Sequence, residues 1–246
     1  MEKLTTKNLN LSYEGLKTIE DISIKLNKGE IVSILGVSGV GKTTLFNVIS
    51  GLIKPDSGVV LLDGKDITNT TGNTSYMLQK DLLLPYKTII DNVSLPLVIR
   101  GEKKSKARKY ASKYFEEFGL QGTENKYPNQ LSGGMRQRAA LLRTYLFSDQ
   151  VALLDEPFSA LDSITKSNMH QWFINVMEQI KLTAFLITHD IDEAILLSDR
   201  IYIMSGKPGK ITDEIIIEDP KPRNKDFIVS ENFMKYKKRI LNELEN

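Results

Sequence analysis

A glycine-rich segment, GVSGVGKTT at residues 36–44, has the residue types and spacing of a loop that holds phosphate groups. Gly36 and Gly41 enclose four residues, and Lys42 and Thr43 follow directly. Glycines let backbone N–H groups surround a β-phosphate, a lysine reaches the β and γ oxygens, and a threonine hydroxyl can ligate Mg²⁺. Because glycine makes up only about 7% of residues in proteins, a chance match in a chain of this length is roughly a one-in-a-hundred event. The segment therefore predicts a site for nucleotide phosphates and Mg²⁺.

A second group of candidate residues stands at the end of the apolar segment VALLDE, residues 151–156. Asp155 would lie at the carboxyl end of a buried strand, which is where α/β sheets bind ligands. Its carboxylate suits the Mg²⁺ shell, and Glu156 can orient or deprotonate an attacking water. An apolar strand that ends in Asp-Glu is common on its own, so this interpretation depends on the phosphate loop.

Two further polar residues follow strand-like segments. Gln79 comes after SYML, and His189 comes after AFLIT. Gln79 could contact both Mg²⁺ and the attacking water, and His189 could hydrogen-bond the γ-phosphate. Taken alone, a glutamine or histidine at a strand end is more often an ordinary surface or core residue, so these assignments also rest on the phosphate loop.

The segment LSGGMRQR, residues 131–138, contains a second possible anion site. Ser132, Gly133 and Gly134 lead directly into a sequence that suits a helix, and the backbone N–H groups at a helix N-terminus attract anions. Because one set of phosphates cannot occupy two separate sites, this segment points to a second nucleotide.

These candidates fall between short apolar strands and helices in alternation. Asp63 and Gly64 form a dipeptide that favours a type I′ turn, which predicts a hairpin over residues 59–67. Alternating buried strands and helices are typical of a mostly parallel sheet with helices on both faces. We expect strands at 30–36, 151–156, 184–188 and 200–204, and helices at 42–52, 163–180 and 190–197.

The middle of the chain, residues 88–147, differs because its pattern is helical throughout. The sequence predicts one helix at 103–119 with an apolar face and a second helix at 132–147. We therefore expect a helical subdomain inserted into an α/β core. The remaining ranges are this core, 1–87 and 148–217, and a C-terminal connector and helix, 218–246, with the helix at 231–245.

Composition and charge exclude several classes of protein. The 246 residues are 41% hydrophobic and 26% charged, and their net charge of +2 gives no strong positive field for binding nucleic acid. The absence of cysteine excludes disulfides and cysteine-based metal sites and fits a cytoplasmic location. The sequence shows no secretory signal and no apolar run long enough to span a membrane. We expect a soluble protein.

Six segments occur in a fixed order: GVSGVGKT, MLQKD, LSGGMRQR, VALLDEP, SALD and ITHD. With them, the chain resembles the nucleotide-binding subunit of ABC transporters from Tyr13 to about residue 217. The resemblance implies a single ABC ATPase domain over residues 1–246. Its fold would be a P-loop NTPase core with a mostly parallel sheet, an N-terminal antiparallel β subdomain and the inserted helical subdomain. The resemblance also implies ATP hydrolysis, with ATP and Mg²⁺ bound.

In this family two subunits face each other head to tail around two ATP molecules, which implies that one partner is a second copy of this chain. Ser132, Gly133 and Gly134 of one copy would then serve the ATP bound by the other. Asp162, in SALD, matches a residue that communicates across that interface. The resemblance further implies catalysis by Glu156, His189 and Gln79, metal ligation by Thr43, Gln79 and Asp155, and nucleotide binding by Tyr13 (stacked on adenine), Gly36, Ser38, Gly39, Gly41, Lys42, Thr43 and Thr44.

Three short segments indicate a branch of the family. LLLPYKTIIDNV (82–93) resembles a stretch of nitrate-, sulfonate- and taurine-type import ATPases, although Tyr86 stands where they have tryptophan. SGKPGKI (205–211) and DPKPR (219–223) resemble the same branch. The resemblance implies an importer for a small anion or organic solute. The subunit would lie on the cytoplasmic face of the cell membrane, bound to separate transmembrane permease subunits that work with an extracytoplasmic solute-binding protein, and no nucleic acid would be bound.

Two other function classes remain open: a soluble ABC ATPase, and a GTPase or small-molecule kinase that uses the same loop. A soluble ABC ATPase of translation or DNA maintenance usually carries two cassettes or a long coiled-coil insertion, whereas only about fifty residues separate Gln79 from Leu131 here. A GTPase would need Asn-Lys-x-Asp for guanine, and the nearest match, NKGE at 27–30, precedes the phosphate loop and has glutamate at the key position. A small-molecule kinase would have no use for the segment at 131–138.

Overall fold

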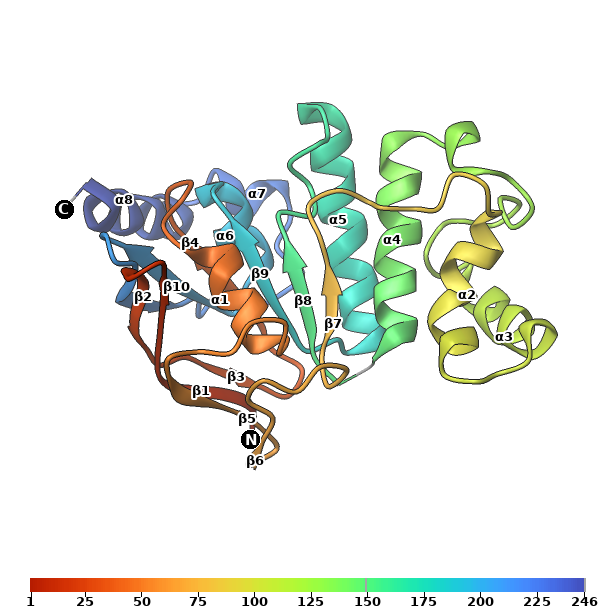
Figure 1. Ribbon diagram of the computed structural model, residues 1–246. Coiled ribbons are helices and arrows are strands. Elements are labelled where there is room, and N and C mark those ends of the chain that lie inside the picture. Colours follow the sequence, from red (N-terminus) through yellow and green to blue (C-terminus); the bar gives the residue numbers. More distant parts are fainter. Residues whose placement is uncertain (149, 246) are drawn as a thin grey trace.

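The computed structural model describes residues 1–148 and 150–245, which form two β-sheets with helices around them and a helical part at one side (Figure 1). Asp149, within the predicted core, and Asn246, at the end of the predicted C-terminal segment, lie outside the described residues. The predicted α/β class is confirmed, with its N-terminal antiparallel sheet and its added helices. No helix in the described ranges is long and apolar enough to cross a membrane.

The first sheet is antiparallel and comes mainly from the N-terminal part of the chain. Its strand order is β2-β1-β5-β6, and β3 pairs with the first residues of β1. Asp63 and Gly64 connect β5 to β6 with φ angles of 48° and 76°, as a type I′ turn requires, so the predicted hairpin is confirmed. The strands are β1 (Glu2–Tyr13), β2 (Leu16–Ile22), β3 (Lys25–Asn27), β5 (Ser57–Leu62) and β6 (Lys65–Asp66).

The second sheet has the strand order β11-β10-β4-β9-β8-β7, and every pair except β11 with β10 is parallel. Every residue of β4, β8 and β9 is buried, as expected for strands that are covered on both faces. The carboxyl ends of β4, β7, β8 and β9 therefore lie at one edge of the sheet. The strands are β4 (Ile31–Leu35), β7 (Ser75–Met77), β8 (Ala152–Asp155), β9 (Ala184–Thr188), β10 (Arg200–Ser205) and β11 (Lys210–Ile216).

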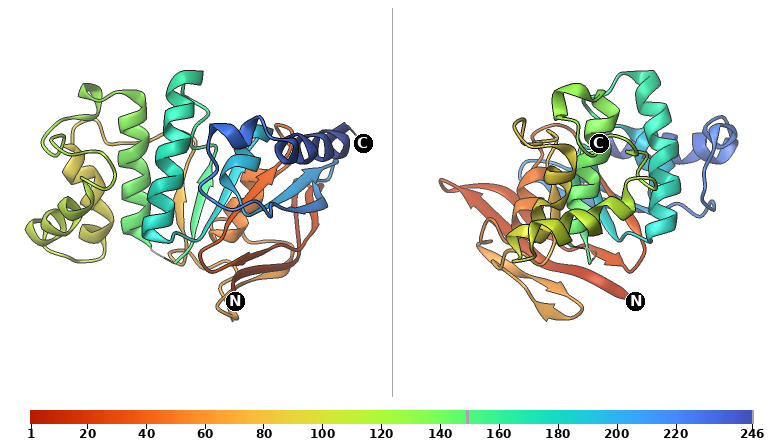
Figure 2. Two further views of the ribbon diagram at one scale, coloured as in Figure 1. Left: turned by 180° about the vertical axis from the view of Figure 1, so that it is seen from behind. Right: turned by 90° about the vertical axis from the view of Figure 1, so that its right-hand side faces the viewer.

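Helices flank this sheet and extend beyond its β7 edge. In Figure 1, and from behind in the left view of Figure 2, α4 lies between α5 and the α2–α3 pair. One hydrophobic core joins these helices to the sheet, since it contains buried residues of α2, α4, α5, β8 and β9. The helices are α1 (Lys42–Ile49), α2 (Ile89–Ile99), α3 (Lys104–Ala111), η1 (Ser112–Tyr114), η2 (Pro128–Gln130), α4 (Gly133–Phe147), α5 (Ser163–Ile180), α6 (Ile191–Leu197), α7 (Lys225–Ile228) and α8 (Glu231–Glu245).

The helix predicted at 42–52 ends earlier than the sequence pattern suggests. α1 stops at Ile49, and Gly51 has a φ angle of 76°. A Cβ atom on Gly51 would lie 2.5 Å from the backbone of Thr70, so a side chain does not fit there. The chain turns at this glycine to begin the hairpin.

The helix predicted at 103–119 is also wrong in its second half. The α-helix ends at Ala111 and continues as a 3₁₀ turn and further turns. Phe115 and Phe118 are nevertheless buried, because these turns fold both rings into the core. Apolar residues in successive tight turns recur at nearly the same spacing as in an α-helix, so the sequence pattern could not distinguish these turns from a continuous helix. Tyr110, expected on the apolar face, is 44% exposed.

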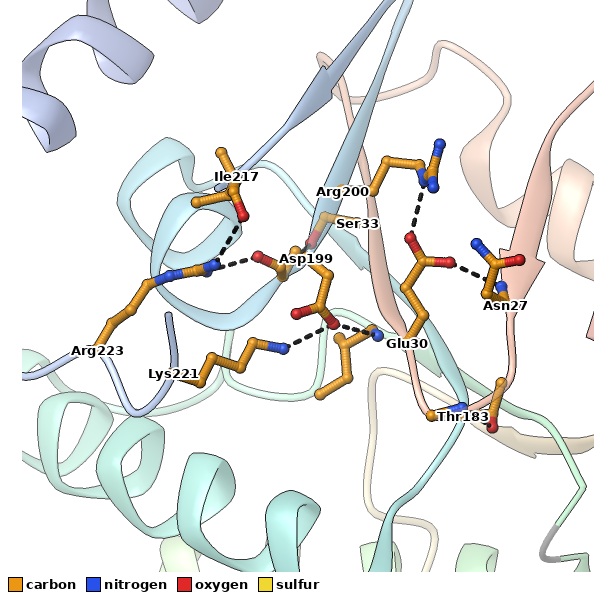
Figure 3. Close-up of polar contacts among 12 residues, drawn as sticks. Asn27, Glu30, Ser33, Thr183, Asp199, Arg200, Ile217, Lys221 and Arg223 are labelled. Atoms are coloured by element: carbon orange, nitrogen blue, oxygen red, sulfur yellow. Dashed lines mark hydrogen bonds and ion pairs between the residues drawn. The ribbon is translucent and has the colours of Figure 1, made fainter. Parts of the chain in front are cut away.

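Two cationic side chains, Arg223 and Lys221, attach the C-terminal connector to the end of the second sheet where β10 begins (Figure 3). The guanidinium of Arg223, which is 2% exposed, donates to the carbonyl oxygens of Ile217 and Asp219, and burial lowers the pKa of Arg223. Lys221 Nζ lies 2.8 Å from the Asp199 carboxylate. These contacts hold the chain before α8, the predicted C-terminal helix, which packs on α6.

Candidate active site

The loop after β4 has a backbone shape that requires glycine. Gly39 and Gly41 have φ angles of 79° and 112°. A Cβ atom on Gly36 would lie 2.3 Å from the carbonyl oxygen of Met204, and one on Gly41 would lie 2.8 Å from the Ile19 side chain. The loop leads into α1, whose first turn contains no acidic residue. The N-terminus of α1 therefore offers backbone N–H groups and a positive dipole end to an anion.

Lys42, the first residue of α1, extends its side chain across this loop. Its ammonium donates to the carbonyl oxygens of Gly36, at 2.7 Å, and Val37, at 2.9 Å. Burial lowers the pKa of Lys42, although the charges of Glu156 and Asp155 act in the opposite direction. The ammonium is therefore held where phosphate oxygens can replace the carbonyl acceptors.

Thr43 and Asp155 meet beside the loop, as predicted for a Mg²⁺ site. The Thr43 hydroxyl donates to Asp155 Oδ2 at 3.1 Å, and the hydroxyl of Tyr76 on β7 lies 3.5 Å from the same oxygen. Burial is the main cause of a raised pKa for Asp155, and the hydrogen bond from Thr43 opposes it. Oxygen ligands of this kind suit Mg²⁺, which keeps several waters and takes phosphate oxygens as further ligands. The described residues contain no cluster of three His, Asp or Glu side chains that could hold a metal ion.

Glu156 is the centre of a second group at the same edge. Gln79 Nε2 donates to Glu156 Oε2 at 3.1 Å, and His189 Nδ1 lies 3.1 Å from Glu156 Oε1. The φ angle of Glu156 is 46°, a left-handed conformation that is uncommon outside glycine and costs roughly 1–3 kcal/mol. The Ser159 hydroxyl donates to the Glu156 carbonyl at 2.9 Å and stabilises this turn. The structure thus brings together the carboxylate, amide and imidazole that were predicted to act on water and the γ-phosphate.

Other predicted nucleotide contacts are accessible. Tyr13, at the end of β1, is 43% exposed, so its ring can receive a base. Ser38 and Gly39 are exposed in the loop, and Thr44 is half-buried in the first turn of α1. Tyr76 and Ser159 were not predicted as neighbours of the site. Tyr76 lies within a strand-like segment that gave no sign of its contact with Asp155.

The second predicted anion site lies apart from this group. Ser132 caps α4, accepting from the Met135 N–H at 3.3 Å, and Gly133 begins the helix. α4 lies beyond β7 and β8, whereas α1 lies on the other side of those strands (Figure 1). Among the described residues, no hydrogen bond or ion pair joins Ser132 to the phosphate loop. Asp162 is likewise exposed and caps α5 through the Thr165 N–H.

Comparison with known proteins shows the family to which the chain belongs. The sequence model of one family, described as ABC transporter, matches residues 19–159. A formylaminopyrimidine import ATP-binding protein of Halalkalibacterium halodurans is 48% identical, over 84% of this chain and 81% of that protein. An aliphatic sulfonates import ATP-binding protein of Bacillus cereus is 40% identical, over 98% of this chain and 93% of that protein. The solved dimer of an ATP-binding cassette in a post-hydrolysis state, bound to ADP and phosphate, has 30% identity and a TM-score of 0.74, covering 88% of this chain and all of that chain.

The Thr43–Asp155 pair generates a prediction for Mg²⁺-dependent binding. Thr43→Val should remove most of the gain in ATP affinity that Mg²⁺ provides, by roughly tenfold or more, because one of the three predicted protein ligands is lost. ATP affinity without the metal should change little, because the backbone N–H groups and Lys42 remain. Isothermal titration with Mg²⁺ and with a chelator measures both quantities. Thr43→Ser, which keeps the hydroxyl, is the control, and an unchanged Mg²⁺ gain in Thr43→Val would contradict the assignment.

Proposed function

The chain belongs to the ABC transporter family, as an ATP-hydrolysing subunit, and on that premise we propose that it works as a pair of identical chains that close around two ATP molecules to drive an importer. One observation carries the proposal. The groups for phosphate binding and water activation meet at one edge of the sheet, while a second anion-binding helix N-terminus stands apart with its serine exposed. A single chain therefore has half of the contacts for each of two nucleotides.

Within one chain, the geometry supports phosphoryl transfer to water. The loop N–H groups and Lys42 bind the β and γ oxygens, and Mg²⁺, when bound, neutralises charge on the same phosphates. Glu156 can accept a proton from a water held between its carboxylate and the γ-phosphate. Gln79 would orient this water and the Glu156 carboxylate. The Nδ1 of His189 lies 3.1 Å from Glu156 Oε1, and when both ring nitrogens carry a proton, Nε2 can donate to a γ oxygen.

The second site would be used by the partner. The N-terminus of α4 is a site of the same kind as the start of α1, and this helix has 15 residues, enough for a full dipole. In a head-to-tail pair, Ser132, Gly133 and Gly134 of one chain would donate to the γ-phosphate bound by the other. A ligand favours a closed state only by binding it more tightly than the open one, and ATP does so because both chains contact it. Hydrolysis removes the γ-phosphate contacts and lets the pair open.

A groove supports binding of a permease subunit. It lies between the segment that follows α1, residues 50–52, and the helical subdomain. It has a volume of about 440 Å³, and its lining combines polar side chains with apolar ones, of which Leu52, Leu82 and Ile99 are 61%, 52% and 74% exposed. Leu82 follows Gln79 closely in sequence, so an apolar helix end from the membrane partner in this groove would contact the segment that also reaches the catalytic water. Arg143 holds that segment in place by donating to the carbonyl oxygen of Leu82 at 2.8 Å.

We propose an importer of a small organic molecule or anion, of the nitrate, sulfonate and taurine class, which an extracytoplasmic binding protein would deliver. The support is that the two relatives described above are named for import of a formylaminopyrimidine and of aliphatic sulfonates. The subunit would then lie on the cytoplasmic face of the membrane through its permease contact. A soluble ABC ATPase of translation or DNA maintenance is not favoured, because these relatives are import subunits.

Replacing the catalytic carboxylate tests the paired arrangement. Glu156→Gln should lower the hydrolysis rate by roughly a hundredfold or more, because the general base is lost, while ATP binding remains. The variant should sediment as a dimer with Mg²⁺-ATP and as a monomer with ADP or without nucleotide. An isolated monomer that hydrolyses ATP at the wild-type rate would contradict the proposal.

A bulky cation at the cap of α4 tests the contact in trans. Ser132→Arg should abolish ATP-driven dimerisation and hydrolysis, because the side chain fills the space for the partner's γ-phosphate, and monomer ATP affinity should stay within about threefold of wild type. Ser112→Arg, an exposed position of the same subdomain, is the matched control and should keep both activities. Equilibrium binding and light scattering measure the two effects. A loss of ATP affinity in the monomer would mean that Ser132 contacts the ATP of its own chain, which would contradict the contact in trans.

A charge in the groove tests the permease contact. Leu52→Glu should leave the ATPase rate of the isolated subunit unchanged and weaken its co-purification with the permease subunits by at least about tenfold, as expected for a central apolar contact. Leu16→Glu, on β2 and 76% exposed, is the matched control. Equal recovery of both variants with the permease would rule out this groove.

A further inference from the structure

We propose that Lys166 is a positioning residue for hydrolysis, because it ties the start of α5 to the start of α6 and so makes the placement of His189 depend on the contact of Asp162 with the partner chain. The inference rests on the proposed function, since it concerns how the paired chains control the γ-phosphate contact. Lys166 lies outside the group of catalytic side chains that surrounds Glu156.

Lys166 joins two helices through a cluster of charged side chains. Its ammonium lies 2.7 Å from Asp190 Oδ2 and 2.9 Å from Glu193 Oε2. Glu193 is buried, with a side-chain exposure of 2%, and His170 Nε2 on α5 lies 3.3 Å from the same Oε2. Lys166 and His170 are one turn apart on α5, and Asp190 and Glu193 belong to the first turn of α6.

The ion pairs are attractive despite their burial. Burial alone lowers the pKa of Lys166, but the hydrogen bond to Asp190 and the charge of Glu193 outweigh it and the pKa is raised. Burial likewise raises the pKa of Asp190, but the Lys166 hydrogen bond and others outweigh it and the pKa is lowered. Each partner therefore favours the charged form of the other, so the contact resists separation of the two helices.

Asp190 connects this cluster to the site. Its Oδ1 accepts the Glu193 N–H at 3.1 Å and caps α6, while its Oδ2 receives Lys166. Its own N–H donates to the Thr188 hydroxyl at 3.0 Å, so the chain on both sides of His189 is fixed. A change in the position of Asp190 would shift His189 relative to Glu156.

The other end of the connection is the start of α5. Lys166 N–H donates to the Asp162 carbonyl at 2.8 Å, which places Lys166 one turn into the helix that Asp162 caps. Asp162 is exposed, and in the proposed pair it would face the partner chain. Movement of α5 on pairing would therefore be passed through one helical turn and one ion pair to the loop that carries His189.

His170 provides a control that distinguishes a positioning role of Lys166 from a purely structural one. It also contacts Glu193, but among the described residues no hydrogen bond or ion pair joins it to Asp190, whose carboxylate it influences only through its charge. Its ring packs edge to face on Phe158, with centroids 5.0 Å apart. His170→Phe keeps a ring beside Phe158 and removes the polar contact with Glu193, so it should destabilise the α5–α6 contact without moving Asp190.

The test compares Lys166→Met, Lys166→Arg and His170→Phe in the full chain for melting temperature, kcat and KM for ATP. We expect Lys166→Met to lower kcat by roughly tenfold to a hundredfold, as small misplacements of catalytic groups do, with KM within about threefold of wild type. Lys166→Arg should recover most of kcat. His170→Phe should lower the melting temperature while keeping kcat within about threefold. A near-wild-type kcat for Lys166→Met, or an equal loss in His170→Phe, would overturn the proposal.

Two further arms separate this inference from the proposed function. In the Glu156→Gln background, Lys166→Met should still dimerise with ATP, because the residue acts on hydrolysis and not on binding; failure to dimerise overturns the positioning role. Asp162→Ala should lower kcat in the wild-type background and have little further effect in Lys166→Met, because the connection is already broken. Additive losses would overturn the proposal. If Glu156→Gln alone failed to dimerise, that result would contradict the proposed function. The comparison of kcat between Lys166→Met and wild type would still decide the role of Lys166.

Discussion

Parallel pairing of β4, β9, β8 and β7 decides where the reacting groups can lie. Asp155 at the end of β8 is in register with Ile187 in β9, so the strands end close to the same level. The residues that follow each strand therefore emerge at one edge, where Gln79, Glu156 and His189 meet although they are far apart in the sequence. β8 and β9 are buried along both faces, so the same burial that stabilises the sheet also fixes the relative positions of these groups.

This edge holds charged groups that would be costly to bury without partners. The Lys42 ammonium is satisfied by loop carbonyls and the Asp155 carboxylate by a hydroxyl, so each group is held by contacts that a phosphate or a cation can replace. The left-handed turn at Glu156 adds strain, which the buried sheet around it has to offset. A loop that already has its ligand-binding shape loses little conformational freedom on binding.

Much of this could be predicted from the sequence because the informative signals are local. The phosphate loop, the apolar strands and the hairpin at Asp63–Gly64 each depend on residues within about ten positions of one another. The second half of the helix predicted at 103–119 was wrong because turns can bury Phe115 and Phe118 at helical spacing. The contacts of Tyr76 with Asp155 and of Lys166 with Asp190 join residues from different elements, and no short pattern in the chain reports which strand or helix will be the neighbour.

The same distinction explains why the segment at Ser132 drew attention from the sequence alone. A helix N-terminus with serine and two glycines carries a local signal for an anion, but the fold places it on a subdomain whose hydrophobic core is not the one that holds the phosphate loop. A chain that contained both sites in contact could bind and hydrolyse ATP by itself at all times. Under the proposed function, separating them would make hydrolysis conditional on a second copy. In that arrangement, the relative positions of the helical subdomain and of the helices that begin at Asp162 and Asp190 would decide when water reaches the γ-phosphate.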